Sequence, residues 1–202
     1  MKNKRGFTLI ELLAVIVILG VLLAIAIPKV SQYINKSRKE SFISAGKIFI
    51  DSVRHDATSE EYPLPVNSND VTIVTLDRAS LQKSKEKSSF SGKYLFNKSY
   101  VAIVNVGTGT YPEYVYYFAA QDSKGYAVAL TEESELSYDD VIANAKNKME
   151  VTIQSLCGTD VGNETSLANI SGLESIQPVD TNGNKISWNA SIFSTDKCVE
   201  SE

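Results

Sequence analysis

The chain has 202 residues and a formal net charge of −4, and 43% of its residues are hydrophobic. This length fits one domain with an appendage. An acidic surface repels phosphate backbones, so the charge argues against a nucleic-acid-binding domain. A single histidine and the absence of a CxxC pair argue against a zinc site. There is no GxSxG motif and no phosphate-binding glycine loop, so we expect neither an enzyme nor a cofactor.

The strongest pattern lies at the N-terminus. Three cations precede Gly6: Lys2, Lys4 and Arg5. An apolar run then extends from Phe7 to Ile27 with one charge in it, Glu11. As a helix, about 21 residues at roughly 1.5 Å each span the hydrocarbon thickness of a bilayer. A lone acid in such a segment is costly to insert, so Glu11 is by default a functional residue that needs a partner.

Residues 4–11, Lys-Arg-Gly-Phe-Thr-Leu-Ile-Glu, together with the apolar run resemble the N-terminus of a type IV prepilin. The resemblance is close over about the first 30 residues. Beyond them the chain is similar only in plan, with a helix, a β-rich head and a late cysteine pair. The resemblance implies that a prepilin peptidase cuts between Gly6 and Phe7 and methylates the new amino terminus on Phe7.

Two other interpretations of the N-terminus stay open. Ala24-Ile25-Ala26 is the small-residue pattern of a secretory cleavage site, and an uncut anchor would show the same apolar run. Against secretion, the run is longer than the usual core of a signal peptide of about 7–15 residues, and Glu11 would have no role. Either alternative would make the chain a secreted or membrane-anchored surface binding protein.

Orientation and partners follow from this N-terminus. The positive-inside rule keeps the leader cations cytoplasmic, so everything after Pro28 is exported. The resemblance implies a prepilin in the cell membrane and an extracellular pilus after assembly. Its implied partners are further copies of itself, other pilins, the prepilin peptidase and an inner-membrane assembly platform. Adhesion to a host surface, DNA binding and motility are open roles of the head and the filament.

Cleavage would place a cation next to an acid. The amino group of Phe7, on the same or a neighbouring subunit, is the expected partner of Glu11, because an unpaired charge in an apolar filament core is strongly disfavoured. This pair would select each incoming subunit and fix its position along the filament. Burial of the apolar run would hold the subunits together.

The apolar run continues as an amphipathic pattern with spacings of three and four residues, so we expect one helix over residues 7–57. Its first part, residues 7–27, is the transmembrane or filament-core segment. Pro28 lacks an N–H, and Gly20 weakens a helix by about 1 kcal/mol relative to Ala. We interpret Gly20 and Pro28 as a functional soft spot in the helix.

Residues 58–202 form the expected head. The runs Tyr100–Val106, Glu113–Ala119 and Tyr126–Leu130 predict an antiparallel meander, whereas Val71–Leu76 is ambiguous. Four further elements are predicted: a short helix over Leu76–Lys83, a capped helix over Ser137–Lys146, a strand over Glu150–Leu156 and a final strand within Lys185–Phe193. The fold class is therefore α+β, with a long N-terminal helix packed on a C-terminal antiparallel sheet.

Two cysteines, Cys157 and Cys198, lie in the last quarter of the chain. In an exported domain such a pair predicts a disulfide, although two separate buried thiols are the alternative. The bridge would close a loop of about 40 residues and stabilise the fold by roughly 4 kcal/mol in the chain-entropy model.

The sequence thus divides into a basic leader (residues 1–6), a long helix (7–57) and an exported head (58–202). Three roles within the resembled family compete: major pilin, minor pilin, and pseudopilin of a secretion or DNA-uptake system. Because Glu11 is present and the head of about 145 residues is large, we favour a pilin, and a major pilin over a minor one.

Overall fold

The computed structural model of the chain describes residues 8–77, 87–95, 98–108, 110–143, 164–167, 170 and 172–193. The chain comprises two compact units, Met1–Arg38 and Lys39–Glu202.

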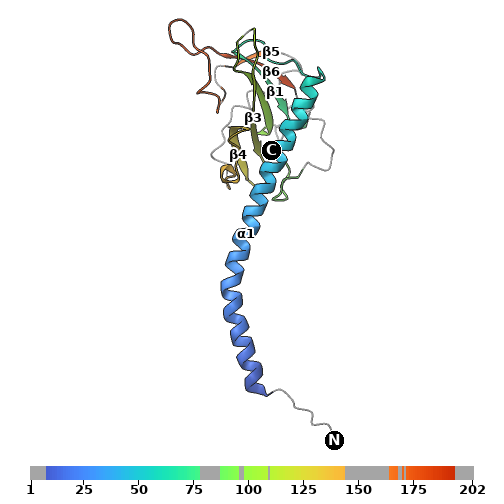
Figure 1. Cartoon of the computed structure of the whole chain (residues 1–202), viewed down its shortest axis with the longest axis vertical. Coiled ribbons are helices and arrows are strands. Elements are labelled where there is room, and N and C mark those ends of the chain that lie inside the picture. The colour runs from blue at the N-terminus through green and yellow to red at the C-terminus, as the bar shows by residue number, and fades with distance from the viewer. Residues whose placement is uncertain are drawn as a thin grey trace. The chain divides into compact units, whose positions relative to one another are not determined.

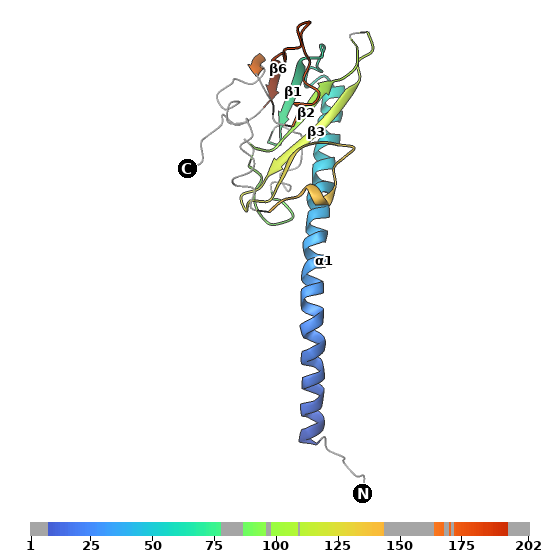
Figure 2. The same cartoon turned by 90° about the vertical axis from the view of Figure 1, so that its left-hand side faces the viewer.

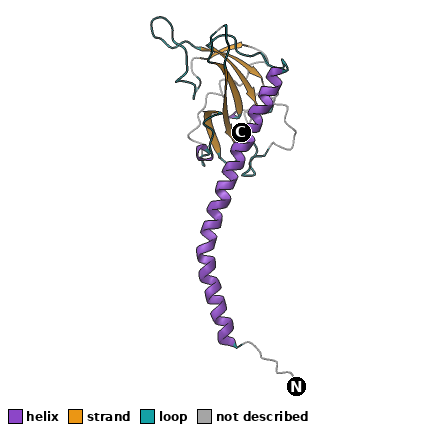
Figure 3. Cartoon of the chain, in the orientation of Figure 1, coloured by secondary structure: helices purple, strands orange, loops and turns teal. Residues whose placement is uncertain are grey.

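One helix dominates the N-terminal quarter of the chain. Helix α1 runs from Leu9 to Thr58 and is continuous across Pro28, close to the expected range of 7–57 (Figures 1 and 3). The apolar and amphipathic pattern of its sequence extends through this length, although Gly20, Pro28 and Gly46 each disfavour a helix.

A six-stranded sheet forms the second unit, in the order β4-β3-β2-β1-β6-β5. Its strands are β1 (Asp70–Thr75), β2 (Tyr100–Asn105), β3 (Tyr114–Gln121), β4 (Ala127–Glu132), β5 (Glu164–Leu167) and β6 (Trp188–Phe193). Strands β1 to β4 follow one another as antiparallel neighbours, which confirms the predicted meander.

The C-terminal part of α1 covers one face of this sheet (Figure 2). Its buried positions recur every three or four residues, which places them on one side of the helix. Phe42 and Phe49 pack there against Tyr94, with ring centroids 5.5 and 5.7 Å apart, and Phe49 also stacks on Phe118 of β3 at 6.3 Å.

The other face of the sheet holds a second apolar cluster. Side chains alternate between the two faces of a strand, so Val101 and Ile103 of β2 join the helix side, whereas Ala102 and Val104 join the far side. Trp188 of β6 is fully buried on this far side, where Leu173 packs in the same cluster.

The α+β class is confirmed, but the sheet is mixed rather than wholly antiparallel. Strand β6 pairs with β1 in parallel, with Val71 opposite Ala190 and Ile73 opposite Ile192. The long chain segment between β1 and β6 permits this crossover, which a tight turn could not make.

The prediction of a capped helix over Ser137–Lys146 is wrong where the structure describes it. Only a 3₁₀ turn forms, η3 (Tyr138–Asp140), and the backbone N–H and Oγ of Ser137 donate to the carboxylate of Asp140 at 2.7 and 3.0 Å. Ile142 then pairs with Ala127 through two backbone hydrogen bonds of 2.9 and 3.0 Å. Pairing with the sheet edge therefore replaces helix continuation.

Other predictions are settled only in part. Val71–Leu76 is resolved as strand β1, and the final strand begins at Trp188, later than Lys185. Most of the predicted helix over Leu76–Lys83 and all of the strand over Glu150–Leu156 lie outside the described residues. Both cysteines, Cys157 and Cys198, also lie outside them, so their bridge stays a prediction.

Candidate functional site at the start of the apolar helix

Helix α1 begins with a reciprocal pair of hydrogen bonds between Thr8 and Glu11. The backbone N–H and the hydroxyl of Thr8 both donate to Oε2 of Glu11 at 2.8 Å, and the Glu11 N–H donates back to Oγ1 of Thr8 at 3.3 Å. This arrangement is a capping box, which satisfies N–H groups that a helix start leaves without intrahelical partners.

The capping box gives Glu11 a second role that the sequence interpretation missed. The signal was present in the string Thr8-Leu9-Ile10-Glu11, a T-x-x-E pattern that directly precedes an apolar run. The carboxylate is held by its own helix end, where the helix dipole also favours negative charge. The Glu11 carboxylate therefore already accepts two hydrogen bonds from Thr8, which reduces the cost of placing this acid in an apolar segment.

The residues that follow form an apolar helix surface that no described part of the chain covers. An 18-residue window of α1 has a mean hydropathy of 3.1 and none of it is buried. Large side chains such as Leu9 and Ile25 are 83% and 64% exposed. Contiguous apolar surface of this size marks a membrane or protein contact, and α1 is long and apolar enough to cross a bilayer.

The remaining predicted residues are placed less completely. Gly6 and Phe7 lie outside the described residues, so the cleavage site and the pairing of Phe7 with Glu11 stay predictions. A Cβ added at Gly20 would meet nothing within 4 Å, so packing within the chain does not require this glycine. The soft spot at Gly20 and Pro28 also stays a prediction.

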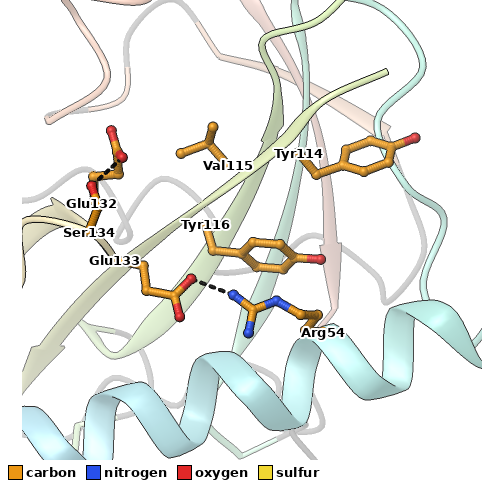
Figure 4. Close-up of a pocket in the computed structure, with 7 residues that line it drawn as sticks. All are labelled: Arg54, Tyr114, Val115, Tyr116, Glu132, Glu133 and Ser134. Carbon is orange, nitrogen blue, oxygen red and sulfur yellow. Dashed lines mark hydrogen bonds and ion pairs between the residues drawn. The ribbon is translucent and has the colours of Figure 1, made fainter. Parts of the chain in front are cut away.

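The second unit has a surface pocket of about 220 Å³ beside α1, β3 and the end of β4 (Figure 4). Arg54 of α1 pairs there with Glu133 and, at 2.6 Å, with Asp51. Its guanidinium carbon lies 4.6 Å from the centre of the Tyr116 ring. Burial raises the pKa of Tyr116, although the positive charge of Arg54 opposes this. These contacts tie α1 to the sheet, and the other side of the pocket is open to solvent.

Metal chemistry has no support in the described part of the chain, where no group of three His, Cys, Asp or Glu side chains could hold an ion. The carboxylate of Asp140, which follows Asp139 in the chain, accepts the hydrogen bonds of Ser137.

The family model "Prokaryotic N-terminal methylation motif" matches residues 1–27, which contain Glu11 and the apolar run. The resemblance to type IV pilins is thereby confirmed. The chain is 32% identical over 103 residues to the "Type IV major alpha-pilin" of Moraxella bovis. The aligned region covers 45% of this chain and 64% of the relative. It is 36% identical over 76 residues to "Fimbrial protein Q" of the same organism. This second aligned region covers 36% of this chain and 48% of the relative.

The chain therefore spans less than two thirds of the length of either relative. No solved structure matches it. Pilins, the family that these relatives represent, are structural proteins.

Proposed function

We propose that this chain is a structural subunit of a type IV pilus, and a major rather than a minor pilin. The observation that carries the proposal is the exposed apolar helix that begins with a capped glutamate, Glu11, next to the expected cleavage site. The N-terminal methylation motif and the similarity to a major pilin support it.

In this proposal the prepilin is anchored in the membrane by residues 7–27, with the leader cytoplasmic and the head exported. Peptidase cleavage after Gly6 then creates a methylated amino group on Phe7. Covalent geometry keeps this nitrogen within about 3.6 Å of the Thr8 nitrogen, which itself donates to Glu11. The new cation is thus close to the carboxylate of its own chain and, in a helix bundle, to that of a neighbour.

Assembly would replace lipid around the apolar helix with the helices of other subunits. A low-dielectric core strengthens a correctly placed pair of charges and penalises an unpaired one, so the Glu11 carboxylate would select the register of each incoming subunit. The heads would then form the outer surface of the filament.

The test is the intact mass and N-terminal residue of the protein as exported by its native host. An N-methylated Phe7 start supports prepilin processing. A start at Ile27 would mean a secreted protein, and a start at Met1 in a host that carries the peptidase would mean an uncut anchor. Either of these results refutes the proposal.

A further inference from the structure

Charge is divided unevenly along this chain. Residues 12–39 contain four cations and no anion, whereas from residue 40 onward 13 cations stand against 23 anions. Heads of separate copies therefore repel each other, and the helix segment of one copy attracts the head of another.

The cations of the helix include an aligned pair. Lys29, Tyr33 and Lys36, here called the basic stripe, follow one another at spacings of four and three residues, which places them on one face of α1. All three are exposed, and Tyr33 is 76% exposed. The two lysines lie about 10 Å apart along the helix axis.

The anions of the head gather at the end of β4. Glu132, Glu135 and Asp139, here called the acidic surface, lie in a stretch, residues 125–145, that contains no cation. Glu135 and Asp139 are exposed and Glu132 is half-buried. Glu133 is already paired with Arg54, but none of the ion pairs in the described residues includes a member of the acidic surface. The negative charge of Glu132 and Glu135 adds to burial in raising the pKa of nearby Tyr117.

Glu132 faces away from Arg54, on the side of the sheet that carries Tyr117. Glu132 is part of the lining of the pocket beside Arg54, but its partner across β3 and β4 is Tyr117, so its side chain shares a face with Tyr117 rather than with Tyr114 and Tyr116. Figure 4 shows Glu133 turned toward Arg54 and Glu132 on the opposite side, away from that cation. The Glu132 carboxylate accepts a hydrogen bond from the Ser134 hydroxyl, and no cation in the described residues pairs with it.

We propose that the basic stripe of one copy docks on the acidic surface of a neighbouring copy. This inference rests on the proposed function, because it needs copies of the chain arrayed side by side. The two surfaces are different parts of the same chain, so each copy can contact one neighbour through its basic stripe and another neighbour through its acidic surface. Such a heterologous contact continues as an open array, the symmetry that a filament requires.

A charge exchange tests the contact in the native host, with sheared pili quantified relative to mature protein in the membrane. Lys29→Glu with Lys36→Glu, and separately Glu132→Lys with Glu135→Lys, should each lower the yield of pili about tenfold. The chain that carries all four substitutions regains the original net charge and should recover at least half of the wild-type yield.

Matched controls separate this contact from net charge. Lys87→Glu with Lys124→Glu, and Glu61→Lys with Glu113→Lys, change exposed side chains by the same charge and should leave the yield within twofold of wild type. Near-normal yield from either test pair, or no recovery in the exchanged chain, overturns the proposal. A Phe7 start in every variant shows that processing is intact, so failure of the docking contact is distinguishable from failure of the proposed function.

Discussion

Substitution of Gly46 by valine tests the packing of α1 on the sheet. A Cβ added at Gly46 would lie 2.6 Å from Cε1 and 2.9 Å from Cδ1 of the Phe118 ring. Phe118 is fully buried and stacks on Phe49, so its ring has little room to move. Only a residue without a side chain allows α1 to approach β3 this closely.

Two effects of opposite sign determine the magnitude. Glycine is among the poorest helix formers, so valine should be favourable by a few tenths of a kcal/mol in an open helix. Overpacking in a dense core costs about 1–3 kcal/mol, and three added carbons place this case at the upper end. We expect a net loss of about 2 kcal/mol, or about 4–8 °C in Tm for a unit of this size.

The single tryptophan provides the assay, because Trp188 is fully buried in the sheet and reports on unfolding of the head. Thermal and denaturant unfolding of the full chain in detergent would be followed by its fluorescence. Ser44→Ala, an exposed position on the same helix, is the control and should leave Tm within about 2 °C of wild type.

A stability of Gly46→Val at or above that of wild type would refute the reasoning, since helix propensity alone predicts that result. A double-mutant cycle with Phe118→Leu, which removes ring volume, identifies the obstacle. The two changes should couple by at least about 1 kcal/mol in the favourable direction. Simple additivity would mean that the Phe118 ring is not what excludes a side chain at Gly46.

Four further predictions concern the helix start and the head. Gly6→Val should block processing, because a bulky β-branched residue would occupy the cut site; mass spectrometry would detect only full-length protein. Glu11→Leu should leave the protein in the membrane but abolish most pilus assembly, as measured by shearing. Thr8→Val should lower pilus yield several-fold through loss of the capping hydroxyl, whose removal typically costs about 1 kcal/mol, whereas Thr8→Ser should assemble normally. Burial raises the pKa of Tyr94 and Tyr100 well above the usual value of about 10, so the unfolded chain loses these protons first and stability should fall as pH rises above about 10.

Each of these predictions has a contradicting outcome. Mature protein from Gly6→Val, or normal piliation by Glu11→Leu in a strain without the native pilin, would remove the assigned roles. Equal yields from Thr8→Val and Thr8→Ser would show that the capping hydroxyl is dispensable. Absorbance at 295 nm that titrates near pH 10 for all tyrosines in the folded head would contradict the burial of Tyr94 and Tyr100.

Local signals account for what could be predicted in the sheet. Strands β2, β3 and β4 are consecutive in the chain and joined by short segments rich in glycine, aspartate or proline, so their antiparallel order follows from turn chemistry. Pairing of β1 with β6 joins residues more than 100 positions apart, and no local pattern specifies such a partner or its direction. The segment after Ser137 shows the same limit, because its capped-helix pattern was overridden by pairing of Ile142 with Ala127.

At the candidate site the sequence by itself determined the apolar span, the lone acid and the resemblance to pilins, because these depend on composition and spacing along one helix. The tertiary structure decided why Gly46 cannot carry a side chain, and that Arg54 neutralises Glu133 while leaving Glu132 to the surface. The physical reason is the range of the interactions. Helix formation and membrane affinity are summed over neighbouring residues, whereas close packing and charge pairing depend on which distant side chains the fold brings together.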